Sequence, residues 1–438
     1  MTMKSQLALA IGKSSAWFLK TFTQGGSALP GKLALSIDPD LLSTISQDYE
    51  VAIITGTNGK TLTTSLSVQA VKQVRDQVLT NATGANMQQG IVSSFLTAPA
   101  LNQKGLAILE VDEGSLKHVV KHLQPSVMVF TNLFEDQVDR FNSVEAVYQL
   151  LLEAAEQAPQ ATIIANGDLP LFANMPVTNP KLYFGFTQGI TQPSPNTATK
   201  CPACGHELIY HSTTYGSLGN YECPSCKLHR PELTFQLNKV IHQDLDGSSF
   251  EFDGQTFHLP IAGLYNIYNA LAAYSLAHFL GVPSDAIQSG MEHAERVAGR
   301  QEEVNVDGKK VQLNLVKNPV GLNQIIDLLA FEEEESTVFV LLNNNYADGQ
   351  DIDWIWQGNF QLLNDYPIRH FFSGGMCKEA MTERLLQADI PENKLSELDS
   401  LDQVIPAIQE APTERVHVLA TFTALADLSK LLTDKGYL

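Results

Sequence analysis

Short apolar runs alternate along the chain with longer segments whose apolar residues recur every three or four positions. The first runs typical of buried strands cover residues 51–55, 107–111, 127–130 and 162–165. Because helix-compatible segments separate them, the pattern predicts a largely parallel sheet with helices on its faces. A short meander is expected later, with Asp253-Gly254 as its turn signal between Phe250 and Leu259.

The same alternation starts again after Arg300. Strands are expected at residues 311–316, 338–342, 370–373 and 416–420, with helices between them. The 438 residues exceed what one ordinary core holds. We therefore predict an α/β protein with an N-terminal helical segment (1–40), a central domain (41–300) and a C-terminal Rossmann-like α/β domain (301–438). The linker is expected near Gly299 to Asn305, and the acidic run Glu332 to Glu335 is expected to be a solvated loop or helix end.

The end of the first apolar run carries the most informative motif, Gly56-Thr57-Asn58-Gly59-Lys60-Thr61. In a glycine-rich loop between a strand and a helix, backbone N–H groups point at phosphates, a lysine offsets their charge, and a threonine hydroxyl holds Mg²⁺. The general phosphate-loop pattern would need a glycine at Ile54, and a plain turn is the alternative. The strand before the motif and the helix after it favour a site for Mg²⁺ and ATP.

Four cysteines form the second strong pattern. Cys201 and Cys204 are separated by two residues, as are Cys223 and Cys226, and 18 residues lie between the pairs. This spacing predicts a closed Cys₄ zinc site of structural type, in an insertion at about residues 195–232. Two disulfides are the alternative. Three nearby histidines are expected to be surface residues: His206, His211 and His229.

Composition narrows the function classes. A hydrophobic content of 44% with 17% charged residues is typical of a globular protein. The net charge of −20 argues against a nucleic-acid partner, because phosphate contacts need a basic surface. No uncharged apolar run reaches the roughly 18 residues of a membrane span. We therefore expect a cytoplasmic protein that is at most peripheral at the inner face of the membrane.

The N-terminal segment differs from the rest in charge. No acidic residue precedes Asp38, whereas four lysines lie among aromatic and aliphatic residues: Lys4, Lys13, Lys20 and Lys32, with Trp17, Phe18, Leu19 and Phe22. One reading is an amphipathic helix that rests on an anionic leaflet. The other, which we favour, is a helix packed on the main domain with a solvated lysine face.

The short loop Gly56 to Thr61 resembles the nucleotide loop of the Mur ligase family, which activates carboxylates as acyl phosphates for attack by an amine. Five further motifs resemble those of the family, in the same order: Glu110 with Asp112 and Glu113, residues 131–140, Asn166-Gly167-Asp168, Asn266 with Asn269, and Gly299-Arg300-Gln301-Glu302. The resemblance implies a central ATP-binding domain of the Mur ligase type. It also implies that Thr61 and Glu110 hold Mg²⁺, that Asn266 and Asn269 meet adenine, and that Lys60 and Arg300 offset phosphoryl charge.

Three departures from the family pattern affect this reading. Gln137 stands where the family has a metal-binding histidine, which puts a second Mg²⁺ in doubt. Tyr265 replaces the histidine before the adenine asparagines. Residues 141–156 contain no lysine that could correspond to the family's carbamylated lysine. None of these departures removes the nucleotide loop.

The C-terminal half carries a further segment, Asp348-Gly-Gln-Asp351-Ile-Asp353-Trp354, after a predicted strand. From the residues alone, Asp351 or Asp353 could simply cap a helix. Together with the cysteine pairs and the early nucleotide loop, however, the segment resembles the ligase subunits of lipid II isoglutaminyl synthase.

That resemblance implies amidation of the D-glutamate α-carboxylate in the lipid II stem peptide, with ammonia from a GatD-like glutaminase. It also implies that Asp351 completes the catalytic triad of that partner. A glutaminase site in this chain is not expected, because Cys377 has no evident paired histidine and is expected to be a small packing residue. The alternatives are a folylpolyglutamate-synthase-like amide ligase and a non-catalytic nucleotide-binding scaffold.

Overall fold

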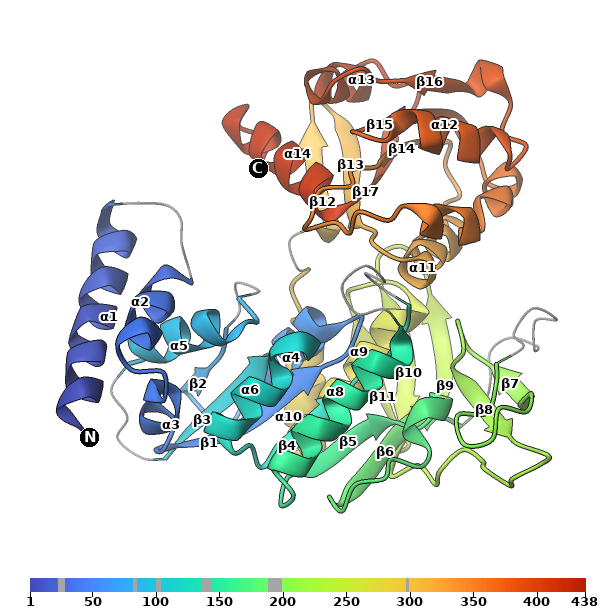
Figure 1. The fold of residues 1–438 in the computed structure, drawn as a ribbon. Coiled ribbons are helices and arrows are strands. Elements are labelled where there is room, and N and C mark those ends of the chain that lie inside the picture. Colours follow the sequence, from blue (N-terminus) through green and yellow to red (C-terminus); the bar gives the residue numbers. More distant parts are fainter. Residues whose placement is uncertain (23–27, 82–84, 100–103, 136–142, 188–198, 297–298) are drawn as a thin grey trace.

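The computed structural model describes residues 1–22, 28–81, 85–99, 104–135, 143–187, 199–296 and 299–438. Its largest element is a nine-stranded sheet in the order β11-β10-β9-β6-β5-β4-β1-β3-β2 (Figure 1). The strands are β1 (Tyr49–Thr55), β2 (Val78–Leu79), β3 (Gly105–Glu110), β4 (Val127–Phe130), β5 (Thr162–Asn166), β6 (Lys181–Phe186), β9 (Phe235–Gln243), β10 (Ser248–Phe252) and β11 (Gln255–Leu259). Strand β1 lies between β3 and β4 and is parallel to both, so the loop that follows it opens near the middle of the sheet.

Helices cover both faces of this sheet. On one face α6 (Glu113–Leu123) packs on α8 (Val144–Gln157). The other face carries three helices in contact with one another: α4 (Lys60–Lys72), α9 (Leu264–Phe279) and α10 (Ser284–Glu292). The connection from β1 to β2 runs toward one edge of the sheet, and the connection from β3 to β4 runs toward the other edge. Because such crossovers are right-handed, α4 and α6 lie on opposite faces.

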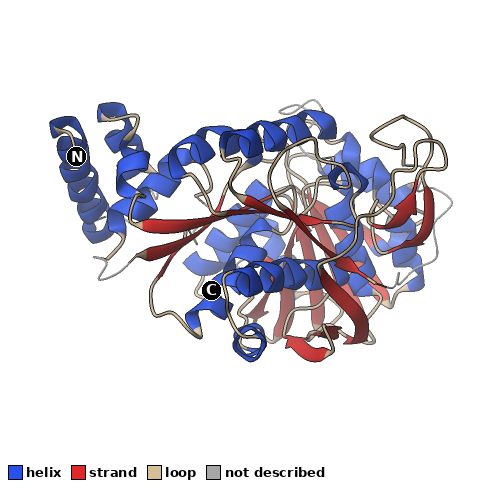
Figure 2. Ribbon diagram, turned by 90° about the horizontal axis from the view of Figure 1, so that it is seen from below, coloured by secondary structure: helices blue, strands red, loops and turns tan. Residues whose placement is uncertain are grey.

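Three N-terminal helices lie beyond the β2 edge: α1 (Met3–Phe22), α2 (Leu29–Ile37) and α3 (Leu41–Ile45). Helix α2 packs on α5 (Gln88–Thr97) at Gly31, where a Cβ atom would lie 1.9 Å from the carbonyl oxygen of Gln89. Figures 1 and 2 both place α1 at one extremity of the molecule. Within the described residues, no helix is long and apolar enough to cross a bilayer.

A second sheet has six strands in the order β12-β13-β17-β14-β15-β16. Its strands are β12 (Arg300–Val306), β13 (Lys309–Leu315), β14 (Ser336–Leu341), β15 (Ile368–Gly374), β16 (Leu395–Glu397) and β17 (Arg415–Ala420). The helices around it are α11 (Pro319–Leu329), α12 (Lys378–Leu386), α13 (Val404–Gln409) and α14 (Phe422–Asp434). Buried apolar side chains form a cluster on each side of the sheet, as in other α/β layers.

Short elements complete the fold. The cysteine-containing segment forms the two-stranded sheet of β7 (Ile209–Thr213) and β8 (Gly219–Glu222), which the apolar pattern did not predict. Short 3₁₀ helices are η1 (Pro170–Phe172), η2 (Asp353–Gln357), η3 (Phe360–Asp365), η4 (Glu392–Lys394) and η5 (Leu401–Gln403). The expected turn at Asp253-Gly254 joins β10 and β11, and both residues have the positive φ angles that suit a tight hairpin.

One sequence prediction is wrong, and a second holds only in part. The segment expected as a linker is strand β12, which pairs antiparallel with β13 and buries Val304 and Val306. The acidic run is a loop in which Glu333, Glu334 and Glu335 are exposed, as expected, whereas Glu332 is buried and lies 3.2 Å from His417 Nε2. Since strands of the second sheet begin at Arg300, we propose that the boundary between the central and C-terminal domains lies next to that residue.

Candidate active site

The loop after β1 needs glycine at two positions. Gly56 and Gly59 have φ angles of +130° and +84°, in the region that L-residues rarely adopt. A Cβ atom at Gly56 would lie 2.3 Å from Thr131 Oγ1, and one at Gly59 would lie 1.9 Å from Asn269 Oδ1. The chain can therefore make this turn only because both residues lack side chains.

Hydrogen bonds from the end of β4 hold the loop in place. Asn132 accepts from the backbone N–H of Asn58 at 2.9 Å and donates to the Asn58 carbonyl at 3.0 Å. The carbonyl of Asn132 accepts from Thr57 N at 2.9 Å. In the described part of the chain, the N–H groups of Gly59, Lys60 and Thr61 have no hydrogen-bond partner. These helix N-terminal donors are free to bind a phosphate.

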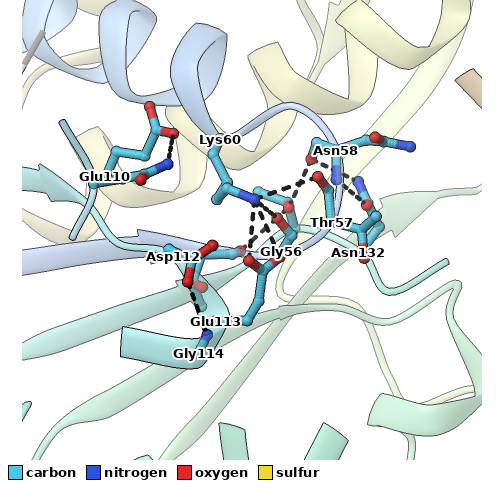
Figure 3. A network of polar contacts seen from close by, with 12 residues as sticks. Gly56, Thr57, Asn58, Lys60, Glu110, Asp112, Glu113, Gly114 and Asn132 are labelled. Atoms are coloured by element: carbon cyan, nitrogen blue, oxygen red, sulfur yellow. Dashed lines mark hydrogen bonds and ion pairs between the residues drawn. The ribbon is translucent and has the colours of Figure 1, made fainter. Parts of the chain in front are cut away.

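Lys60 lies over the loop and contacts Glu113, the first residue of α6 (Figure 3). Its Nζ donates to the Gly56 carbonyl at 2.6 Å and forms an ion pair with Glu113 at 3.1 Å. Burial alone would lower the pKa of Lys60, but the charges of Glu113, Glu110 and Asp112 outweigh burial and raise it. The lysine is therefore a fixed positive charge beside the loop.

Carboxylates gather at the carboxyl end of β3. Glu110 Oε1 accepts from Asn86 Nδ2 at 3.0 Å, and its backbone N–H donates to Asn81 Oδ1 at 2.9 Å. Asp112 caps α6 by accepting from Gly114 N at 3.1 Å. Burial lowers the pKa of Arg300, while the charge of Glu110 acts in the opposite direction, so these two groups are close enough to interact. Carboxylate oxygens are the ligands that Mg²⁺ prefers, and Thr61 lies partly exposed in the first turn of α4.

The two predicted adenine residues lie on α9 beside the loop. Asn269 Oδ1 accepts from Thr63 Oγ1 at 3.5 Å, and Asn269 Nδ2 donates to Asn266 Oδ1 at 3.2 Å. Asn266 in turn donates to the Ala262 carbonyl at 2.7 Å. Both side chains are buried. The helix therefore contacts the same loop that would hold the phosphates.

The second sheet reaches this loop through one reciprocal amide pair. Asn318 Nδ2 donates to Asn58 Oδ1 at 3.0 Å, and Asn58 Nδ2 donates back to Asn318 Oδ1 at 3.4 Å. Asn318 Oδ1 also caps α11 by accepting from Gly321 N at 2.8 Å. The start of α11 is thus tied to the nucleotide loop.

The four cysteines converge into one cluster. Their sulfur atoms all lie within 4.8 Å of one another, and the nearest pairs, Cys201 with Cys226 and Cys204 with Cys223, are each 3.5 Å apart. These separations exceed a disulfide bond of about 2.05 Å. They suit a tetrahedral ion with Zn–S bonds of about 2.3 Å, which would fill the centre of the cluster. The donor set therefore fits zinc.

The cysteine segment docks on a buried aspartate. Asp168 accepts from Arg230 Nη1 at 3.1 Å, shortly after the last cysteine, and from Tyr268 OH on α9 at 2.6 Å. Burial raises the pKa of Asp168, although these donors and the Phe186 N–H act in the opposite direction. Asp168 thus joins the cysteine segment to the helix that carries Asn266 and Asn269.

The loop after β14 contains two aspartates in different environments. Asp348 is buried and accepts from Asn345 N at 3.1 Å and from Thr423 N at 2.7 Å. Asp351 is exposed, and its Oδ1 accepts from Asp353 N at 2.8 Å in the turn before η2. Asp348 fixes the loop, while Asp351 is presented at the surface.

Some predicted residues lie elsewhere. Gln137, on which the second Mg²⁺ depends, lies outside the described residues. Cys377 precedes α12, and burial raises the pKa of its thiol, which suits a packing residue and not a nucleophile. The roles of Asn81, Asn86 and Asn132 were not predicted from the sequence. Only Asn132 had a signal, its place in the motif that begins at Thr131.

The sequence matches two family models, that of the Mur ligase middle domain over residues 54–199 and that of the MurT ligase C-terminal region over residues 315–425. The chain is 41% identical to the MurT subunit of the glutamine-hydrolysing lipid II isoglutaminyl synthase of Streptococcus pneumoniae, over 99% of this chain and 98% of the relative. The MurT subunit from Staphylococcus aureus is 30% identical over 89% of each chain.

Solved structures share the fold at lower identity. A pseudomurein peptide ligase from Methanothermus fervidus aligns with a TM-score of 0.68 at 19% identity, over 91% of this chain and 81% of that one. MurF from Thermotoga maritima, solved with ADP, aligns with a TM-score of 0.64 at 14% identity, over 92% of this chain and 84% of that one. The fold is that of the Mur ligases, and the chain belongs to the Mur ligase family, in the group of the MurT subunits.

Proposed function

We propose that this chain is the ligase subunit of a lipid II isoglutaminyl synthase. It would use ATP to phosphorylate the α-carboxylate of D-glutamate in the lipid II stem peptide, and ammonia would displace the phosphate to give D-isoglutamine. The observation that carries the proposal is the glycine loop with unpaired N–H donors, with Lys60 and the acids Glu110 and Glu113 beside it. The relatives from Streptococcus pneumoniae and Staphylococcus aureus, each named as a subunit of a glutamine-hydrolysing lipid II isoglutaminyl synthase, support the proposal.

The donors, cations and acids around the loop each have a proposed role in binding ATP. The N–H groups at the start of α4 and the ammonium of Lys60 bind the phosphates, with Lys60 exchanging Glu113 for phosphate oxygen. Arg300 offsets charge on the transferred phosphoryl group. Glu110 and Thr61 would hold Mg²⁺, which supplies further charge neutralisation when bound. Asn266 and Asn269 border the adenine position.

Two further parts of the chain have roles outside the ATP reaction. The Cys₄ cluster would hold zinc and keep the cysteine segment folded. The exposed Asp351 would orient the catalytic histidine of a GatD-like glutaminase, as the acid of a triad does. Because the substrate is lipid-linked, the complex would work as a peripheral protein at the inner face of the membrane.

The decisive experiment supplies the chain with Mg·ATP, lipid II and either ammonium or a glutaminase partner with glutamine. Mass spectrometry should detect the amide only when ATP is present. ATP hydrolysis should depend on lipid II. Glutamylation of a folate acceptor with lipid II unchanged would support the synthase-like alternative, and binding of ATP without turnover would support the scaffold alternative.

A further inference from the structure

Helix α1 contacts the rest of the molecule through a narrow face of small residues. Ser5, Ala8, Gly12 and Ala16 recur at three or four positions and are buried. The approach is close, because a Cβ atom at Gly12 would lie 2.6 Å from Leu96 Cδ1 of α5. The helix is therefore firmly seated on its neighbours, with most of its circumference facing outward.

The outward face is apolar. Met3, Leu7 and Ile11 recur every four residues and are 88%, 55% and 39% exposed. Single exposed apolar residues are ordinary on protein surfaces, whereas a row on one helix indicates a surface that contacts something. The sequence prediction of a solvated lysine face is thus incomplete, because the same side of α1 carries this row.

Positive charge borders the row. Lys4 and Lys13 are exposed, and the helical repeat of about 100° per residue places Lys4 about 60° to one side of Leu7 and Lys13 about 120° to the other. All 48 acidic residues of the chain lie after residue 37, although the chain as a whole carries a net charge of −20. This end is a cationic, apolar surface on an acidic protein.

The helices next to α1 connect this surface to the acids of the nucleotide site. Helix α5 packs on α1 and α2, and its N-terminal end follows Asn86, which donates to Glu110. Figures 1 and 2 show α1 at the extremity of the molecule, on the side away from β7 and β8. A planar surface could therefore contact α1 without meeting the cysteine segment.

We propose that the face of α1 formed by Met3, Leu7 and Ile11 docks on the surface of an anionic phospholipid bilayer. The apolar side chains enter the headgroup region, and Lys4 and Lys13 contact lipid phosphates. Charge favours this occupant over a second copy of the chain, because pairing two such faces would bring like charges together. The surface is distinct from the nucleotide site, and binding requires neither ATP nor lipid II.

The test is sedimentation of the full chain, alone and with its glutaminase partner, with vesicles of phosphatidylglycerol or of neutral phosphatidylcholine. The wild type should bind the anionic vesicles, and added salt should weaken binding. Leu7→Ser with Ile11→Ser should reduce the bound fraction. Lys4→Glu with Lys13→Glu should weaken binding by at least about 20-fold, since each lysine near such a surface contributes about 1 kcal/mol.

A matched control separates local from global charge. Lys239→Glu with Lys310→Glu changes the net charge equally at exposed strand positions and should leave vesicle binding unchanged. Equal binding of the wild type to both vesicle types would overturn the proposal. A Leu7/Ile11 variant that binds vesicles normally but alters the oligomeric state or the partner affinity would assign the face to a protein contact instead.

Discussion

The two sheets use the same architectural position for different purposes. Each places a loop at the carboxyl end of a parallel strand, where ligands bind in open α/β sheets. After β1, the loop is held by Asn132 and Lys60, and its unpaired N–H groups are available to a phosphate. After β14, buried Asp348 holds a loop that exposes Tyr346 by 83%.

The difference lies in what each loop leaves unpaired. The loop after β1 offers backbone donors within the chain, beside a lysine and several acids. The loop after β14 offers an exposed carboxylate, Asp351, beside exposed apolar side chains, which suits a surface that contacts another protein. We therefore expect the loop after β1 to serve the chemistry of this chain and the loop after β14 to contact a partner.

Lys60→Ala should have the largest effect on amidation driven by free ammonium. Losing the ammonium removes phosphate charge compensation and leaves Glu113 without its cation, so amidation should fall by at least about 100-fold with both glutamine and ammonium. Rates from each nitrogen source, measured beside partner binding, check this. Normal turnover by the variant would show that the loop after β1 is not part of the ATP site.

Cys201→Ser with Cys223→Ser should have the next largest effect, on stability. A closed Cys₄ shell contributes folding free energy, so the variant should lose about one zinc per chain and unfold at a temperature lower by several degrees. Elemental analysis and thermal unfolding measure both quantities. A native protein free of zinc would contradict the assignment.

Asp348→Ala tests whether the Asp348 side chain holds the loop after β14 in place. The backbone N–H groups of Asn345 and Thr423 would lose their carboxylate acceptor, at a cost of about 2 kcal/mol. Glutamine-driven amidation should fall by roughly tenfold, while ammonium-driven amidation should persist. Denaturant unfolding gives the stability change, and an unchanged unfolding midpoint would show that Asp348 does not hold the loop.

The smallest expected effect is on how the stability of the second sheet depends on pH. Burial alone raises the pKa of Glu332, but the hydrogen bond to His417 and the charge of Arg415 outweigh it and lower the pKa. A carboxyl with a lower pKa in the folded state stabilises the fold above its unfolded value of about 4.3 and loses that contribution as pH falls through the folded pKa. Glu332→Gln should flatten the loss of stability in acid, as followed by circular dichroism. An identical acid profile would contradict the pairing.

Local patterns predicted much of this molecule. Gly56 and Gly59 are required by backbone angles, so the loop could be recognised from its residues, as could the cysteine spacing. Strand β12 was missed even though Asp307-Gly308 carries the same turn signal that identified the hairpin at Asp253-Gly254. The alternation of Val304 and Val306 with polar residues also pointed to a strand.

The missed contacts join residues that are distant in the chain. Asn58 and Asn318 are 260 residues apart, and Asp168 lies 100 residues from Tyr268. Burial of Glu332 depends on His417, which lies 85 residues further along. The spacing of apolar and polar residues within one segment cannot predict such contacts, because they form only when the sheets assemble.

The most direct test of the two-loop account is the rate of lipid II amidation by Asp351→Asn with glutamine and with free ammonium. Asparagine keeps the size of the side chain and an acceptor for the Asp353 N–H. The account predicts a loss of about 10⁴-fold with glutamine, as for a triad acid, and an unchanged rate with ammonium. Full glutamine-driven activity, or a loss of the ammonium-driven reaction as well, would contradict it.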